Sequence, residues 1–148
     1  MTRLTRIATL IAATTLAAGC VHPPRLGHVS TASAPTCAPG DTALRRSVLY
    51  FGAAIPNRSD TVDAAEWLAF LDREVTPRFP DGLTWFDARG QWRGHDGQVI
   101  GEPSRVLVLL HSEDADTTAA VEAIRTAYKQ VFAQEAVMVE RELSCVAF

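Results

Sequence analysis

Outside the N-terminus, the apolar residues of this chain gather in short runs. Residues 106–110, Val-Leu-Val-Leu-Leu, lie between Pro103 and a polar segment that starts at Ser112. Five apolar residues with two β-branched members are too few for a helix, and they predict a central strand that is covered on both faces. Residues 47–55 are apolar at both parities and stop at Pro56, which predicts a second central strand.

Two other segments show the spacing of amphipathic helices. Asp63 and Glu66 match a capping box, and Trp67, Phe70, Leu71 and Val75 follow at helical intervals, so we predict a helix over residues 63–76. Asp114 or Asp116 is expected to cap a second helix that ends near Gln134. The apolar stripe of this second helix is Val121, Ile124, Tyr128, Val131 and Phe132.

The remaining elements complete a regular order. Residues 83–91 predict a strand, residues 94–97 a hairpin turn, and residues 137–146 an edge strand with one wetter face. The order strand, helix, strand, strand, helix, strand is that of the ferredoxin-like βαββαβ plait. We therefore expect an α+β domain over residues 47–148. Its four-stranded antiparallel sheet should have the order 4-1-3-2, with both helices on one face.

The N-terminus has the pattern of an export signal. Arg3 and Arg6 precede an apolar run over residues 7–18, which is too short to span a bilayer, so residues 1–19 predict a signal peptide. Residues 16–20, Leu-Ala-Ala-Gly-Cys, resemble a bacterial lipobox, which predicts a lipid on Cys20. The alternative is an ordinary cleaved signal in which Cys20 is incidental. Because Val21 follows the cysteine, we expect the periplasmic side of the outer membrane in a cell with two membranes.

Residues 20–46 are rich in Pro, Ser, Thr and Ala, and they predict a flexible linker between lipid and domain. Loss of residues 1–19 removes two positive charges and changes the formal charge from −3 to −5. An acidic chain without a basic cluster is a poor nucleic-acid binder, so no nucleic-acid partner is expected. Cys37 and Cys145 are expected to form a disulfide in an oxidising compartment, the alternative being two free thiols.

Four segments carry a resemblance to a known family. They are TPRFPDGLT at residues 76–84, GQWR at 90–93, EPSRVLVLLH at 102–111 and YKQVFAQE at 128–135. In these segments the chain resembles a family of small bacterial secreted and lipid-anchored proteins that is known only as a domain of unknown function. The resemblance covers residues 47–148. It implies an envelope location, and it brings no activity, cofactor or catalytic residue.

Strand parity sorts the side chains between a helix-covered face and an open face of the sheet. The predicted helix-side set is Phe86, Val106, Val108, Leu110, Val137 and Val139. The predicted open-face set is Tyr50, Trp85, Asp87, Arg89, Leu107, Leu109, His111, Met138, Glu140 and Glu142. The apolar members of the open face, Leu107, Leu109 and Trp85 among them, predict a homodimer that covers this face.

A pocket on the open sheet face of such a dimer, enclosed between sheet and helices, would be lined by Tyr50, Trp85, Asp87, Arg89 and His111. Two of these assignments have simpler alternatives, a hydrogen-bonded strand-end histidine for His111 and a surface ion pair for Asp87 with Arg89. We expect neither a metal nor a cofactor, and no catalytic residue is identified.

Two functions fit these features, because the plait hosts many activities. The first is a lipid-tethered binding or assembly module of the cell envelope. The alternative is a small cofactor-independent enzyme, isomerase or oxygenase-like, with its pocket on the open face of a dimer.

Overall fold

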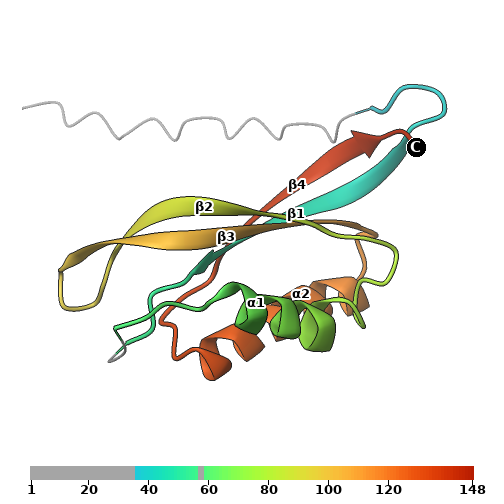
Figure 1. Cartoon of the computed structure of the whole chain (residues 1–148). Coiled ribbons are helices and arrows are strands. Elements are labelled where there is room, and N and C mark those ends of the chain that lie inside the picture. The colour runs from blue at the N-terminus through green and yellow to red at the C-terminus, as the bar shows by residue number, and fades with distance from the viewer. Residues whose placement is uncertain (1–35, 57–58) are drawn as a thin grey trace, which may run out of the picture. The chain divides into compact units, whose positions relative to one another are not determined.

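Four antiparallel strands and two helices form an α+β fold in the computed structural model, which describes residues 36–56 and 59–148. The elements in chain order are β1 (Thr42–Gly52), α1 (Ala64–Phe70) with a π-helical turn η1 (Leu71–Val75), β2 (Thr84–Arg93), β3 (Val99–His111), α2 (Ala115–Val131) and β4 (Met138–Val146). Both helices lie on the same side of the sheet (Figure 1). The predicted types and order of the elements are confirmed.

The sheet has the order β2-β3-β1-β4, which is 4-1-3-2 read from the opposite edge. β1 pairs with β3 and with β4, so that Val48 lies opposite Val108 on one side and Glu140 on the other. The two doubly apolar runs are therefore the two central strands, as predicted. β1 and β3 begin earlier than expected, at Thr42 and Val99, because backbone pairing continues beyond the apolar residues.

Both helices start at the residues that the sequence indicates. The Asp63 and Glu66 capping box is formed: Glu66 N–H donates to Asp63 Oδ1 at 2.8 Å, and Asp63 N–H donates to Glu66 Oε2 at 2.9 Å. Asp114 caps α2 and accepts a bond from Thr117 N–H at 2.7 Å. Hydrogen bonds from the Ser112 hydroxyl and from Thr117 lower the pKa of Asp114 to about 2.

An aromatic cluster fills the space between the sheet and the helices. The Phe51 ring lies 5.2 Å from that of Trp67 and 4.6 Å from that of Tyr128, and Phe70 lies 5.1 Å from Tyr128. The Tyr128 hydroxyl donates to the Gly52 carbonyl oxygen at 2.9 Å, and burial raises its pKa. This cluster ties both helices to β1, so the shape of the sheet is fixed from the helix side.

The predicted assignment of side chains to the two sheet faces is wrong on β2 and β3 and correct on β4. Leu107 and Leu109 are fully buried and pack, with Trp85, against the helices. The open face instead carries Phe86, Val106, Val108 and Leu110 from these strands. Both parities of β3 are apolar, so hydrophobicity alone does not orient it. The helix side also holds the polar residues Arg105 and His111, which a sequence pattern places outside the core.

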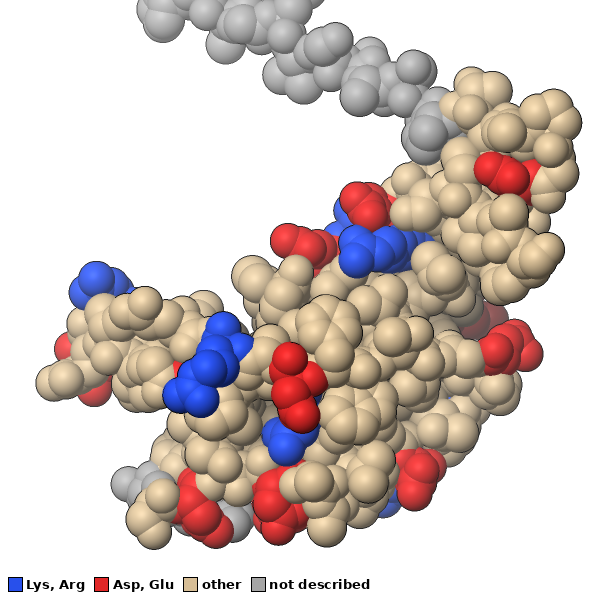
Figure 2. All heavy atoms as spheres, turned by 45° about the horizontal axis from the view of Figure 1, so that its top comes forward, with Lys and Arg blue, Asp and Glu red and all other residues tan. Residues whose placement is uncertain are grey.

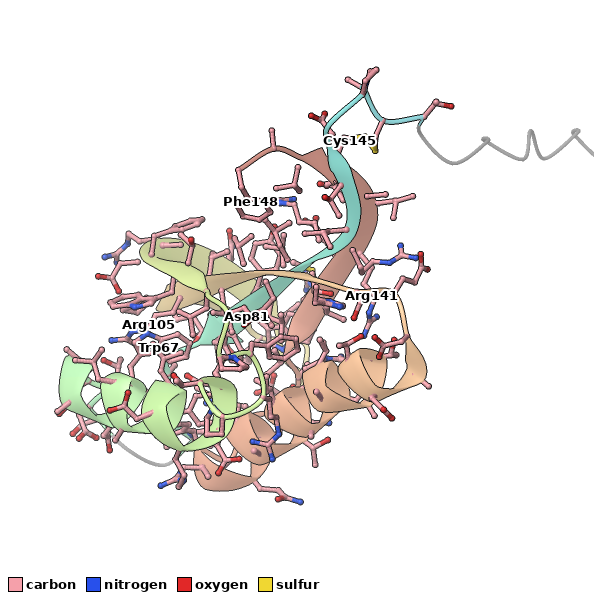
Figure 3. The ribbon with its side chains drawn as sticks, turned by 90° about the vertical axis from the view of Figure 1, so that its right-hand side faces the viewer. Trp67, Asp81, Arg105, Arg141, Cys145 and Phe148 are labelled. Carbon is pink, nitrogen blue, oxygen red and sulfur yellow. A yellow bond between two sulfur atoms is a disulfide. The ribbon has the colours of Figure 1, made fainter. Side chains whose placement is uncertain are left out.

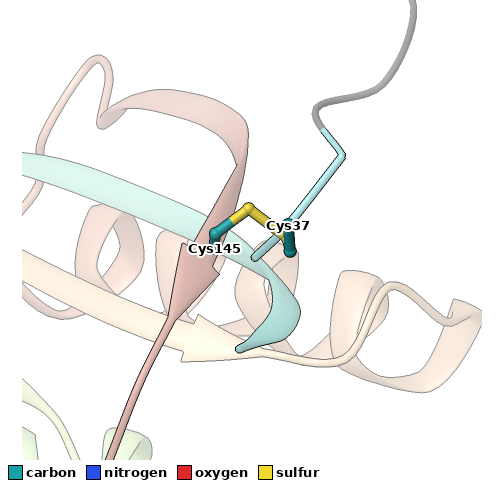
Figure 4. Close-up of a disulfide and its surroundings, with 2 residues drawn as sticks. All are labelled: Cys37 and Cys145. Atoms are coloured by element: carbon teal, nitrogen blue, oxygen red, sulfur yellow. A yellow bond between two sulfur atoms is a disulfide. The ribbon is translucent and has the colours of Figure 1, made fainter. Parts of the chain in front are cut away.

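The disulfide between Cys37 and Cys145 is present, as predicted, with the two Cα atoms 5.3 Å apart (Figure 4). Cys145 lies near the end of β4, where it pairs with Ala43 of β1. The bridge therefore joins the chain at Cys37 to β4, and residues 42–46, expected as linker, belong to β1. Cys20, the signal peptide and most of the predicted linker lie outside the described residues.

Candidate ligand-binding groove

The β2–β3 hairpin bends over the open face of the sheet. Its strands are paired as far as Arg93 and Val99, and the turn between them contains Gly97 with a φ of 81°. Near the tip, Trp92 Nε1 donates to Glu135 Oε2 at 3.3 Å, and His95 Nε2 lies 3.8 Å from the same oxygen. The hairpin thus contacts the loop before β4. In Figure 2 the end of the hairpin is the lobe at the left, set off from the body by a notch.

A groove of about 830 Å³ lies between the bent hairpin and the open face. Its apolar and aromatic wall is formed by Tyr50, Ile55, Ala88, Trp92, Ile100, Val106 and Met138. All of these residues except Ile55 lie on strands, and on each of the four strands their side chains have the parity that points away from the helices. In the register of the sheet, Val106, Tyr50 and Met138 lie side by side across β3, β1 and β4. The size and lining are those of a site for a small organic molecule.

Glu102 places a carboxylate on the floor of the groove. Its Oε2 accepts a hydrogen bond from Ala54 N–H at 2.8 Å. The carboxylate lies over Gly52, where an added Cβ would be 2.5 Å from Oε1, so only glycine leaves room for it. Oε1 has no hydrogen-bond partner among the described residues. The groove therefore contains one half-buried carboxylate that is held in place and still has an oxygen available to a ligand.

Tyr50 contributes a second polar group to the groove. Its hydroxyl donates to Glu140 Oε2 at 2.9 Å, and this bond raises the pKa of Tyr50. The hydroxyl is thus already engaged as a donor, and the ring remains as part of the groove floor.

The structure separates the five residues predicted for a common pocket. Tyr50 and Arg89 line the groove. Trp85 packs on Trp67 at 6.0 Å between ring centroids, on the helix side. Asp87 Oδ1 lies 3.6 Å from the Nε of Arg105, again on the helix side, and His111 is buried there. A functional role for these residues stays a prediction. They cannot line one cavity as predicted, because Tyr50 and Arg89 line the groove while Trp85, Asp87 and His111 lie on the helix side of the sheet.

His111 and Ser47 form a buried polar pair in the core. Ser47 Oγ lies 2.9 Å from His111 Nε2, and Nδ1 donates to the Ser112 carbonyl oxygen at 2.7 Å. The distance suits a base and its hydroxyl nucleophile. Ser47, however, is fully buried, the His111 ring packs 5.5 Å from that of Phe79, and neither residue lines the groove. The pair satisfies polar groups inside the core, as the simpler interpretation of His111 requires.

Arg105 is the other polar residue on the helix side. Its guanidinium lies 5.6 Å from the Trp67 ring centroid and donates to the Val62 carbonyl oxygen at 3.0 Å. Figure 3 shows Arg105 directly beside Trp67, between α1 and the sheet. The Arg105 charge therefore serves packing between α1 and β3 and does not reach the groove.

Sequence reasoning missed Trp92, Glu102 and Glu135 as groove residues. A signal for Glu102 was present: Ile100, Glu102, Ser104 and Val106 share one parity, so extending the central strand toward the hairpin turn places all four on one face.

Neither helix of the described residues is long and apolar enough to cross a membrane. Within the same residues, no three His, Cys, Asp or Glu side chains are grouped to hold a metal ion.

Sequence comparison gives the family. Residues 46–148 match the family described as "Protein of unknown function (DUF3574)". The chain belongs to this family. The disulfide of this DUF3574 chain indicates an oxidising environment outside the cytoplasm. Comparison with the curated proteins finds no match.

Solved structures share the fold of the DUF3574 domain. A phage SAM lyase in complex with S-methyl-5'-thioadenosine aligns with a TM-score of 0.54 and 17% identity, over 77% of this chain and 95% of the lyase chain. A phage SAM lyase in its apo state aligns with a TM-score of 0.52 and 17% identity, over 78% of this chain and 97% of that chain. At this identity the likeness concerns the fold alone.

Proposed function

We propose that this protein is a binding module of the cell envelope that holds a small organic molecule in the groove on its open sheet face. The observation that carries the proposal is the groove itself, about 830 Å³ with a mainly apolar wall and one positioned carboxylate. A ferredoxin-like plait is part of the proposal, supported by the element order and by the sheet order.

Lipid anchoring through Cys20 is also part of the proposal. Its support is the lipobox resemblance of residues 16–20 together with the disulfide, which indicates export. Cys20→Ala is expected to release the protein from membranes or to leave the uncleaved precursor, because no acyl chains can then be attached. Cell fractionation and electrophoretic mobility measure this, and a variant that fractionates and migrates like wild type would contradict the anchor.

Ligand binding can be measured at Met138, because the chain contains only two methionines, Met1 and Met138. The full chain labelled with ¹³C at the methionine methyl groups is titrated with benzyl alcohol, a small neutral aromatic probe. The Met138 methyl signal is expected to shift and to saturate, since this side chain lines the groove and is 52% exposed. S-methyl-5'-thioadenosine, held by the phage lyase, serves as a second and larger probe.

Two variants of β2 provide the control for this titration. Ala88→Phe fills the groove and is expected to abolish the saturable shift. Thr84→Phe adds the same ring on the same face of β2 outside the groove lining, and it is expected to leave the shift intact. A shift that survives Ala88→Phe, or a Met138 signal that does not respond to either probe, would remove the groove as a binding site.

Two further candidates have one observation each. For the small-enzyme alternative it is that the phage lyase, an enzyme, has a similar fold. Self-association through the open face is favoured by Phe86 and Leu110, which are 50% and 39% exposed there. The predicted dimer contacts Leu107, Leu109 and Trp85 cannot serve, because they lie in the core.

A further inference from the structure

We infer that the groove selects an organic cation, with its positive group against Glu102 and an apolar or aromatic body along Trp92, Ile100 and Met138. This inference rests on the proposed binding function and names the class of ligand. It is carried by the charges that line the groove, by the way in which Glu102 is held and by the aromatic residues that line the same groove.

Glu102 is the half-buried acidic group of the groove, whereas the other two acidic lining residues are exposed. Of these two, Glu135 already contacts Trp92 and His95, and Asp96 Oδ1 accepts a hydrogen bond from Gln98 N–H at 2.9 Å. Glu102 makes one bond through Oε2 to the Ala54 backbone, and within the described chain it forms no ion pair. A half-buried carboxylate without a cation attracts a positive ligand more strongly than an exposed one does.

The basic side chains of the hairpin do not neutralise this carboxylate. Arg89 lines the groove edge, but by strand alternation its side chain belongs to the helix-side row of Asp87. Arg93 Nη1 donates to the Gly97 carbonyl oxygen at 3.1 Å, within the turn. The groove floor therefore keeps the negative charge of Glu102, which disfavours an anionic ligand.

The surroundings of Glu102 suit an organic cation better than a hydrated inorganic one. Trp92 and Tyr50 present aromatic rings to the same groove, and ring faces attract organic cations. A metal ion would require several oxygen ligands, and within the described residues no such group of acidic side chains exists. One half-buried carboxylate with aromatic and aliphatic walls suits an ammonium or a similar organic cation.

The test compares three compounds with one benzyl ring and different charge, titrated into the full chain with the ¹³C-methyl signal of Met138 as readout. Benzyltrimethylammonium is expected to bind about tenfold more tightly than benzyl alcohol, and phenylacetate more weakly than either. Raising the salt concentration should weaken only the binding of the cation toward that of the alcohol.

Glu102→Gln is the decisive variant, because the amide oxygen can still accept the Ala54 N–H bond while the charge is lost. It is expected to reduce the affinity for benzyltrimethylammonium about tenfold and to leave that for benzyl alcohol unchanged. The matched control is Glu142→Gln, which removes a charge from the open face outside the groove, where Glu142 pairs with Arg46 at 2.9 Å. This control should leave all three affinities unchanged.

The outcomes separate this inference from the proposed function. Equal affinities for the three compounds, or an equal loss of benzyl alcohol binding in Glu102→Gln, would overturn the cation preference and leave a binding groove. Failure of all three to shift Met138 in a saturable manner would overturn both. Thermal unfolding of each variant shows whether it is folded, and Gly52→Ala, which displaces the carboxylate sterically, provides a second route to the same loss of cation binding.

Discussion

Leu109→Glu is expected to unfold the domain. Leu109 is fully buried on the helix side of β3, in the same core as Leu107 and Leu49. The substitution removes a buried aliphatic side chain and places an unpaired charge in the core, which costs more than about 4–5 kcal/mol. Because small domains have a total unfolding free energy of roughly 5–15 kcal/mol, little or no folded protein should remain. Circular dichroism and thermal unfolding measure the effect.

Leu110→Glu is the matched control, one residue further along the same strand. Leu110 is 39% exposed on the open face, so a carboxylate there reaches water and should change the unfolding free energy by no more than about 1 kcal/mol. If the open face self-associates as proposed, the same variant should sediment as a folded monomer. A folded Leu109→Glu protein together with an unfolded Leu110→Glu protein would show that the face assignment of β3 is reversed.

Loss of the Cys37–Cys145 disulfide has the second large expected effect. The bridge joins residues separated by 108 positions, and for a closed loop of this size the chain-entropy model gives a stabilisation of roughly 4–5 kcal/mol. The double variant Cys37→Ser with Cys145→Ser should lose about this much unfolding free energy. β1 and β4 remain paired in the variant through the ladder from Thr42 to Tyr50, so the fold itself should persist.

Urea unfolding of wild type and variant, each with and without reductant, measures this effect. Reductant should lower the midpoint of the wild type to that of the double variant and leave the variant unchanged. A wild type whose midpoint does not depend on reductant would contradict the stabilising role of the bridge. Labelling of free thiols in the unreduced protein shows separately whether the bridge is formed.

Local patterns predicted most of the fold. Trp67, Phe70 and Val75 recur at helical spacing, and Asp63 with Glu66 fixes the start of α1, so helix position follows from neighbouring residues alone. The sheet order followed from chain connectivity, because two right-handed crossovers leave few alternatives. The length of the β2–β3 hairpin could not be predicted from the sequence. The residues near its tip are Gly-rich and polar, and they pair through backbone hydrogen bonds, which leave no pattern in the side chains.

The faces of the strands and the groove were harder to predict, for two physical reasons. On β3 both parities are apolar, and the polar residues Arg105 and His111 lie in the core, where Val62 and Ser47 from other elements each form a hydrogen bond with them. The groove depends on the hairpin bending toward Glu135, a contact between residues that are far apart in the chain. Such compensation by distant partners has no local signature in a sequence.

The position of the disulfide also determines how the domain carries mechanical load. Cys37 precedes β1 and Cys145 lies close to the end of the chain, so residues 38–144 form a covalently closed loop. A pulling force between the segment before Cys37 and the segment after Cys145 passes across the sulfur atoms and does not stretch this loop. Apart from the last pair of the sheet, Val146 with Thr42, the strands, the helices and the groove therefore bear no tension from such a pull. A covalent bond resists it in place of the hydrogen bonds between strands.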